Sequence, residues 1–222
     1  MKLFSASFVD GGTIPAEFAF CAIDPAQHVK LSANKNPQLS WSDWPAGTKS
    51  LTLICHDPDA PSRGDDVNQE GKTVPADLPR VDFFHWVLVD ILPPSAVIEE
   101  GDFSAGVTAR GKSGPEIVGG NLHGARQGQN DYTGWFASDP AMSGVYCGYD
   151  GPCPPWNDAI AHRYQFTLYA LDVERLAVEG QFTGSQARAA MDGHILAQAQ
   201  LCGLYTLNPT LHTGLNPEPT VR

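Results

Sequence analysis

The chain has 222 residues, which is enough for one large domain with a buried core. Its 14 Lys and Arg residues against 25 Asp and Glu residues give a formal net charge of -11, which disfavours nucleic acid and anionic membrane surfaces as partners. The N-terminal residues turn polar by Asp10, and no apolar run approaches the roughly 20 residues of a membrane span. We therefore expect a single domain, no transmembrane segment and a cytoplasmic location.

Short apolar runs between 22 Gly and 18 Pro residues predict many brief strands joined by turns. Residues 50–57, "SLTLICHD", form the first clear candidate strand, which runs directly into the motif "HDPDAPSR". Residues 83–92, "FFHWVLVDIL", are apolar on both faces, as expected for a strand covered on two sides. This strand places His85 on a row that faces the core.

The Gly-rich, polar stretch 102–150 is typical of long surface loops. After it, residues 162–172, "HRYQFTLYALD", alternate as a half-buried strand does. His162 and Tyr164 fall on the more apolar face. Arg163 falls on the opposite face, where we expect a structural salt bridge.

Residues 185–202 predict the longest helix of the chain. Ser185 is a suitable N-cap residue, and Gly203 suits the position just beyond the last turn. Gly193 inside this segment costs about 1 kcal/mol relative to Ala. The predicted fold class is therefore all-β with minor helix.

The five cysteines are odd in number and lack CxxC spacing: Cys21, Cys55, Cys147, Cys153 and Cys202. This pattern disfavours both a disulfide framework and a zinc ribbon. We expect the thiols to be reduced and mostly buried.

Three predicted strand ends carry polar groups next to proline-rich turns. They hold Asp57 with Asp59, then His85, and then His162 with Tyr164. Because proline fixes φ, these turns would hold a carboxylate facing a histidine ring without a large entropy loss on binding. This convergence predicts one shared pocket. The alternatives are that the two aspartates cap a turn through backbone amides and that each histidine is a core residue.

The motifs of the chain, taken in order, resemble the phosphatidylethanolamine-binding protein family, which includes the Raf kinase inhibitor proteins, and specifically its bacterial and archaeal branch. The matching pieces run along the whole chain: "FVDGGTIP", "NPQLSW", "PAGTKSL", "DPDAPSR", "HWVLVDI", "GPCPPW", "HRYQFTLYALD" and "AMDGHILAQAQLCGLY". Each piece alone is a weak signal, but eight in the same order are specific.

This resemblance implies a two-sheet antiparallel β-sandwich with a C-terminal α-helix and a small anion pocket at one end. It also implies a homodimer without a cofactor. Carried over to this sequence, the pocket would be lined by Asp57, Asp59, Pro61, His85, Pro154, His162 and Tyr164. Residues 64–82, "GDDVNQEGKTVPADLPRVD", form an insertion that we expect at the rim of the pocket or as a lid over it.

A phosphate ester requires N–H and O–H donors, which the two histidines and the tyrosine of this pocket can supply. Its aspartates would either accept from the ammonium group of a phosphoethanolamine-like head group or fix a histidine tautomer. The sequence thus predicts a binding protein for a small phosphate-like anion or a phospholipid head group, in which replacement of His85 or His162 weakens binding and leaves the fold intact. Two alternatives stay open: inhibition of a kinase or protease by protein contact, and, less favoured, a hydrolase or a mixed His/Asp metal site.

Overall fold

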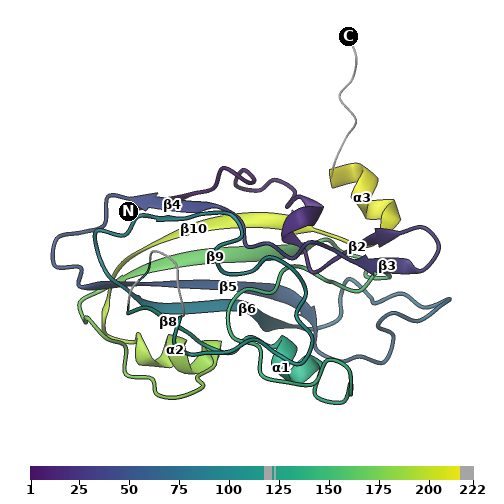
Figure 1. Ribbon diagram of the computed structural model, residues 1–222. Coiled ribbons are helices and arrows are strands. Elements are labelled where there is room, and N and C mark those ends of the chain that lie inside the picture. Colours follow the sequence, from purple (N-terminus) through teal and green to yellow (C-terminus); the bar gives the residue numbers. More distant parts are fainter. Residues whose placement is uncertain (118–121, 123, 216–222) are drawn as a thin grey trace, which may run out of the picture.

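The computed structural model describes residues 1–117, 122 and 124–215, and these are organised around antiparallel sheets (Figure 1). The large sheet has five strands in the order β10 (Ile195–Tyr205), β9 (His162–Leu171), β5 (Ser50–Pro61), β6 (Arg80–Ile91) and β8 (Arg126–Gln127). A three-stranded sheet contains β1 (Lys2–Phe4), β4 (Leu39–Ser42) and β7 (Val97–Ile98). The hairpin of β2 (Cys21–Asp24) and β3 (His28–Leu31) forms a separate two-stranded sheet.

The main core lies between the large sheet and the smaller ones. Alternate residues of β5 and β9, such as Leu53 and Phe166, belong there to the same buried cluster as Trp41 of β4. The opposite face of the large sheet packs Ile54 and Val87 against α2 (Gly184–Ala190) and the loop before it. The predicted strands at residues 50–57, 83–92 and 162–172 are confirmed, and so is the antiparallel sandwich.

The helix predicted over residues 185–202 is wrong in its second half. Helix α2 ends at Ala190, and Gly193 has a φ of +78°, which leads the chain out of the turn after the helix. The following residues form β10, which pairs with β9 from Ile195 to Tyr205. Gly203 is therefore a strand residue, and a Cβ there would clash with the side chain of Ile14. Ala and Gln favour helix, but pairing along β9 overrides that preference.

The N-cap of α2 is Thr183, not Ser185, because the Thr183 side chain accepts a hydrogen bond from the Gln186 backbone. The other helical segments are short: η1 (Ala16–Phe18), α1 (Tyr132–Trp135) and the C-terminal α3 (Pro209–Leu215). None of the helices in the described part of the chain has the length and apolar composition needed to cross a lipid bilayer.

The stretch 102–150 is mostly loop, as predicted, but it is not confined to the surface. It contributes β8 and α1, and it buries Asp150, whose carboxylate accepts hydrogen bonds from the amides of Asn34 and Asn130. Lys112 forms an ion pair with the same carboxylate at 2.9 Å. The polar composition is compatible with burial because these groups satisfy one another.

Candidate functional site

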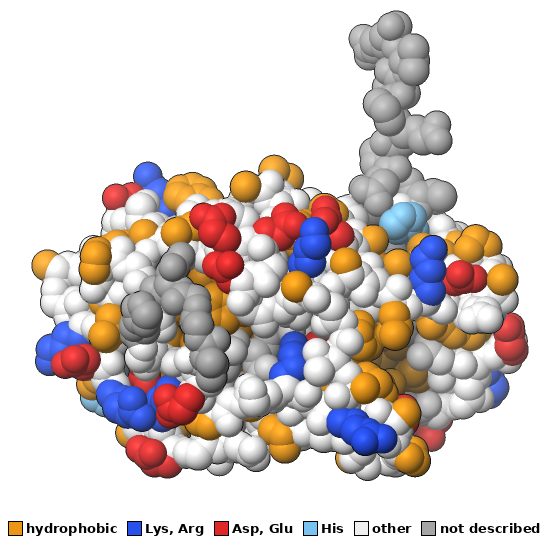
Figure 2. Space-filling model, viewed as in Figure 1, with side chains coloured by type: hydrophobic (Ala, Val, Ile, Leu, Met, Phe, Trp, Pro, Cys, Tyr) orange, Lys and Arg blue, Asp and Glu red, His pale blue; other side chains and the backbone are white. Residues whose placement is uncertain are grey.

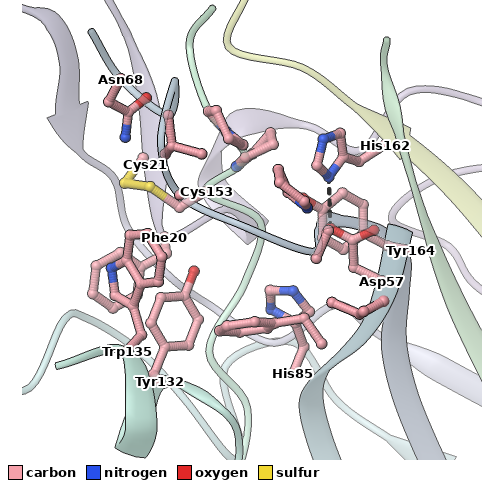
Figure 3. A pocket seen from close by; sticks show the side chains of 18 of the residues that line it. Phe20, Cys21, Asp57, Asn68, His85, Tyr132, Trp135, Cys153, His162 and Tyr164 are labelled. Carbon is pink, nitrogen blue, oxygen red and sulfur yellow. Dashed lines mark hydrogen bonds and ion pairs between the residues drawn. A yellow bond between two sulfur atoms is a disulfide. The ribbon is translucent and has the colours of Figure 1, made fainter. Parts of the chain in front are cut away.

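A cavity of about 510 Å³ opens at the end of the large sheet, where β5 ends and β6 and β9 begin. Figure 2 shows a hollow lined with hydrophobic side chains between α1 and the β2–β3 hairpin. Six of the seven predicted pocket residues line the cavity: Asp57, Pro61, His85, Pro154, His162 and Tyr164. Figure 3 labels Asp57, His85, His162 and Tyr164. The antiparallel order of the three strands explains this convergence, because the end of β5 lies beside the beginnings of its two neighbours.

The motif "DPDAP" continues β5 instead of forming a separate turn. The pairing register between β5 and β6 shifts between Asp57 and Ala60, so the strand is bulged at the two aspartates. Asp57 Oδ1 accepts the backbone N–H of Asp59 at 2.7 Å. Asp57 thus makes the local hydrogen bond that an aspartate capping a turn would make. Its other oxygen, however, has a partner on β9.

That partner is His162, which lies between two carboxylates. Its Nδ1 is 2.7 Å from Asp57 Oδ2, and its Nε2 is 3.0 Å from Asp158 Oδ2. Burial alone would lower the pKa of His162, but the hydrogen bonds to Asp158 and Asp57 outweigh it and raise the pKa to about 9. The ring is a buried imidazolium, and neither nitrogen is available to act as a general base.

Asp59 does not line the cavity. Its carboxylate accepts hydrogen bonds from Arg163 Nε at 2.8 Å and Arg163 Nη2 at 2.7 Å. Burial alone would raise the pKa of Asp59, but the hydrogen bonds from Arg163 outweigh burial and lower it. The salt bridge predicted for Arg163 is confirmed. The two aspartates of the motif therefore point to different partners, one on each face of β9.

His85 is buried at the side of the cavity. Its Nδ1 donates to the backbone carbonyl of Asp150 at 2.7 Å, since a carbonyl can only accept. This bond fixes the tautomer and leaves Nε2 as the ring nitrogen available to a ligand. Burial lowers the pKa of His85, so the neutral ring presents an acceptor at Nε2. The His85 ring packs edge-on against Tyr164, with centroids 5.1 Å apart.

Most of the apolar wall was not predicted from the sequence. It consists of side chains from the β2–β3 hairpin, β6 and α1, including Phe20, Leu31, Val81, Phe83, Tyr132, Trp135 and Phe136. The insertion 64–82 contributes Val67 and Asn68 as well as Val81, so its predicted position at the rim is confirmed. These side chains come from separate segments of the chain, and no sequence pattern identifies them as one wall.

Cys21 and Cys153 also line the cavity, and they form a disulfide with a Cα–Cα distance of 4.9 Å. The prediction of reduced thiols is therefore wrong for this pair and holds for the other three cysteines. The two residues lie 132 positions apart, so sequence spacing gave no sign of the pair. The remaining thiols are those of Cys55, Cys147 and Cys202.

Thiol titration of the denatured, unreduced protein is expected to find three free thiols, because only Cys55, Cys147 and Cys202 are unpaired. After reduction the count should rise to five. Five reactive thiols before any reductant is added would contradict the disulfide.

A further histidine, His194, lies outside the cavity. His194 is in the turn after α2 instead of within a long helix, and its Nδ1 is 2.8 Å from Asp172 Oδ1. His123, for which the sequence indicated no role, is outside the described residues. Within residues 1–117, 122 and 124–215, no group of three or more His, Cys, Asp or Glu side chains is arranged to hold a metal ion.

Comparison with known proteins identifies the family of the chain. The family model described as "Phosphatidylethanolamine-binding protein" matches residues 4–206. The chain is 35% identical to a UPF0098 protein of Methanothermobacter thermautotrophicus, over 92% of this chain and 98% of that protein. It is 29% identical to the UPF0098 protein YbhB of Escherichia coli, over 93% of this chain and 100% of that protein.

Solved structures show the same architecture. A phosphatidylethanolamine-binding protein homologue from Chlamydia trachomatis aligns with a TM-score of 0.60 and 30% identity, covering 92% of this chain and 95% of that one. YbcL of E. coli aligns with a TM-score of 0.65 and shares the fold at 24% identity, covering 92% of this chain and 97% of that one. The family match over most of the length and these relatives show that the chain belongs to the phosphatidylethanolamine-binding protein family.

Proposed function

We propose that this protein binds a small molecule carrying a phosphate-type group, such as a phosphoethanolamine-like head group, in the cavity at the end of the large sheet. The observation that carries the proposal is the convergence of Asp57, His85 and Tyr164 in one cavity of about 510 Å³. A cavity of this size is within the range of small-molecule sites, which combine apolar walls with a few polar groups.

Each polar group has a distinct role in this proposal. The Tyr164 hydroxyl donates to the phosphate oxygens, and Arg63 at the mouth adds a positive charge. His85 Nε2 becomes a further donor when the ring takes up a proton at low pH. Asp57 accepts from the ammonium group of a zwitterionic ligand. Pro61 and Pro154 form rigid parts of the wall. Asp59 is hydrogen-bonded to Arg163, and His162 is hydrogen-bonded to Asp57, so these two residues help to fix the position of the strands and of the Asp57 carboxylate.

We favour binding over hydrolysis because His162, the histidine of the site with the raised pKa, is already hydrogen-bonded through both ring nitrogens. Both nitrogens of His162 are hydrogen-bonded to carboxylates, so this ring cannot take a proton from water or from a nucleophile. His85 Nε2 is the remaining candidate base. Turnover of phosphate or carboxylate esters that disappears in a His85→Ala variant would favour the hydrolase instead.

Protein contact is a second candidate function, and one observation favours it. Three large apolar side chains at the mouth are strongly exposed: Leu31 at 63%, Val81 at 48% and Trp135 at 57%. Such a rim suits contact with a protein partner such as a kinase or protease. Native mass spectrometry of freshly purified protein would separate these cases, since it reports a copurified small molecule, a stoichiometric protein partner and the proposed homodimer in one measurement.

Phosphoethanolamine is expected to raise the melting temperature of the wild-type protein, because a ligand that binds only the folded state stabilises it. At a pH below about 6.5, replacement of His85 by Ala should abolish most of this rise. Because burial lowers the pKa of His85, protonation of Nε2 should strengthen binding only as the pH falls below about 6.5, the ordinary histidine value. Thermal melts across this pH range test the prediction.

The matched control is His194→Ala, which removes a histidine outside the cavity and should leave the ligand-induced rise unchanged. A rise that is equal in the wild-type protein and in His85→Ala contradicts the assignment of His85.

A further inference from the structure

Two carboxylates of this protein fix the charge of the His162 ring. Carboxylate oxygens of Asp57 and Asp158 lie 2.7 Å and 3.0 Å from its two ring nitrogens. Ionised carboxylates only accept hydrogen bonds, so both ring nitrogens must carry a proton. His162 is 1% exposed, and therefore water does not replace either partner.

Asp158 is itself held in a rigid position. Its two oxygens accept from Arg80 Nη1 at 2.6 Å and Arg80 Nη2 at 3.0 Å, a bidentate ion pair with a fully buried carboxylate. The remaining donors of this guanidinium bind the backbone carbonyls of Asp59, Pro75 and Leu78. All five N–H groups of Arg80 are thus used, and a lysine could not reproduce the arrangement.

The neighbouring elements offer no competing charge at the ring nitrogens. Strand β5 contributes Asp57 and the Arg163-paired Asp59, and β6 contributes His85 and Arg80. On β10, the residue directly opposite His162 is Tyr205, whose hydroxyl donates to the backbone of Cys21. The charges therefore alternate in sign along one line of contacts that ends at the cavity: Arg80, Asp158, His162 and Asp57.

The consequence concerns Asp57, the carboxylate that faces the cavity. A lone carboxylate would repel a phosphate, but the imidazolium at 2.7 Å compensates its charge. We propose that Asp158, anchored by Arg80, is a positioning residue that keeps His162 doubly protonated and so allows the cavity to accept an anion beside Asp57 at neutral pH. This inference rests on the proposed function. It also gives the insertion 64–82 a role, since Arg80 belongs to it.

The pKa of His162, raised to about 9, agrees with this geometry. Asp158→Asn would remove one of the two carboxylate partners and leave the positive charge of Arg80 unbalanced nearby. Both changes lower the pKa of His162 toward or below its ordinary value of about 6.5. In this variant the ring therefore loses its charge near neutral pH.

The test measures the affinity for glycerophosphoethanolamine by calorimetry at about pH 6.5 and about pH 8.5, where its phosphodiester keeps a single negative charge. For the wild-type protein the dissociation constant should agree within about twofold at the two pH values, since His162 is charged at the lower value and mostly charged at the higher. For Asp158→Asn the dissociation constant should be about tenfold higher at about pH 8.5 than at about pH 6.5. The control Asp172→Asn removes the carboxylate of a remote His–Asp pair and should behave as the wild type does.

A second readout follows the ring nitrogens of His162 directly by NMR. The wild-type ring should stay doubly protonated until the pH approaches about 9, and the Asp158→Asn ring should titrate well below that value. Equal pH profiles and equal titrations in the two proteins overturn the inference. If Asp158→Asn does not fold, the wild-type titration decides by itself: a His162 ring that titrates near pH 6.5 overturns the inference. If the wild-type protein does not bind the probe, the proposed function fails, and the NMR titrations still decide whether Asp158 sets the charge of His162.

Discussion

Replacement of His162 by alanine is expected to destabilise the fold by about 3–5 kcal/mol, because it leaves buried carboxylates without their cation. Asp57 has no other charged hydrogen-bond partner among the described residues, whereas Asp158 retains Arg80. The sequence alone predicts a variant that folds normally, but that prediction treats the histidine as a ligand contact and not as part of a buried ion pair. Urea denaturation of the two proteins measures the difference.

A double variant separates lost charge compensation from lost packing. Asp57→Asn in the His162→Ala background removes the uncompensated carboxylate and should recover part of the lost stability. His194→Ala is the control, since its pair with Asp172 is partly exposed and contributes about 0–1 kcal/mol. A single variant as stable as the wild type would contradict the ion pair, and no recovery in the double variant would assign the loss to packing.

The same ion pair gives the stability a defined pH dependence. The pKa of His162 is raised to about 9 in the folded protein, above its ordinary value of about 6.5 in an unfolded chain. Its contribution is therefore complete below about pH 6.5 and is lost as the pH rises through about 9. The stability difference between the wild-type protein and His162→Ala should shrink over this range, and a constant difference would contradict the raised pKa.

Removal of the disulfide between Cys21 and Cys153 is expected to destabilise the protein by about 2–5 kcal/mol. The bond closes a loop between residues 132 positions apart, so it greatly restricts the unfolded chain. In the folded protein it fastens the β2–β3 hairpin, a two-stranded sheet that pairs with no other strand in the described part of the chain. Denaturation of Cys21→Ser, and of the wild-type protein with and without a phosphine reductant, measures the effect.

Cys202→Ser is the matched control for this experiment. Cys202 is a free, half-buried cysteine on β10, outside the cavity, and its replacement should change the stability little and leave the effect of the reductant intact. If reduction does not lower the denaturation midpoint of the wild-type protein, the disulfide does not fasten the hairpin.

The strands and the site could be predicted from the sequence where side-chain type and alternation give the same answer. Residues 162–172 alternate clearly, so His162, Tyr164 and Arg163 were assigned to their correct faces. In residues 195–205 the same alternation is present, with Leu201 and Tyr205 buried, but helix-forming Ala and Gln at the other positions concealed it. Only the pairing partner, β9, decides between the two structures.

The limits at the site have a similar cause. The sequence brings together Asp57 and His162 but gives no sign that Asp158, four residues before His162, occupies the second ring nitrogen. It gives no sign of the disulfide either, because Cys21 and Cys153 meet only in the folded chain. Which hydrogen-bonding groups remain available to a ligand depends on such partners, and the three-dimensional arrangement is needed to identify them.

A crystal structure of the protein with phosphoethanolamine tests the central claim most directly. We expect the phosphate within hydrogen-bond distance of His85 Nε2 and the Tyr164 hydroxyl, with His162 still held between Asp57 and Asp158. A cavity that stays empty at saturating ligand, or a phosphate bound elsewhere on the molecule, would contradict the account.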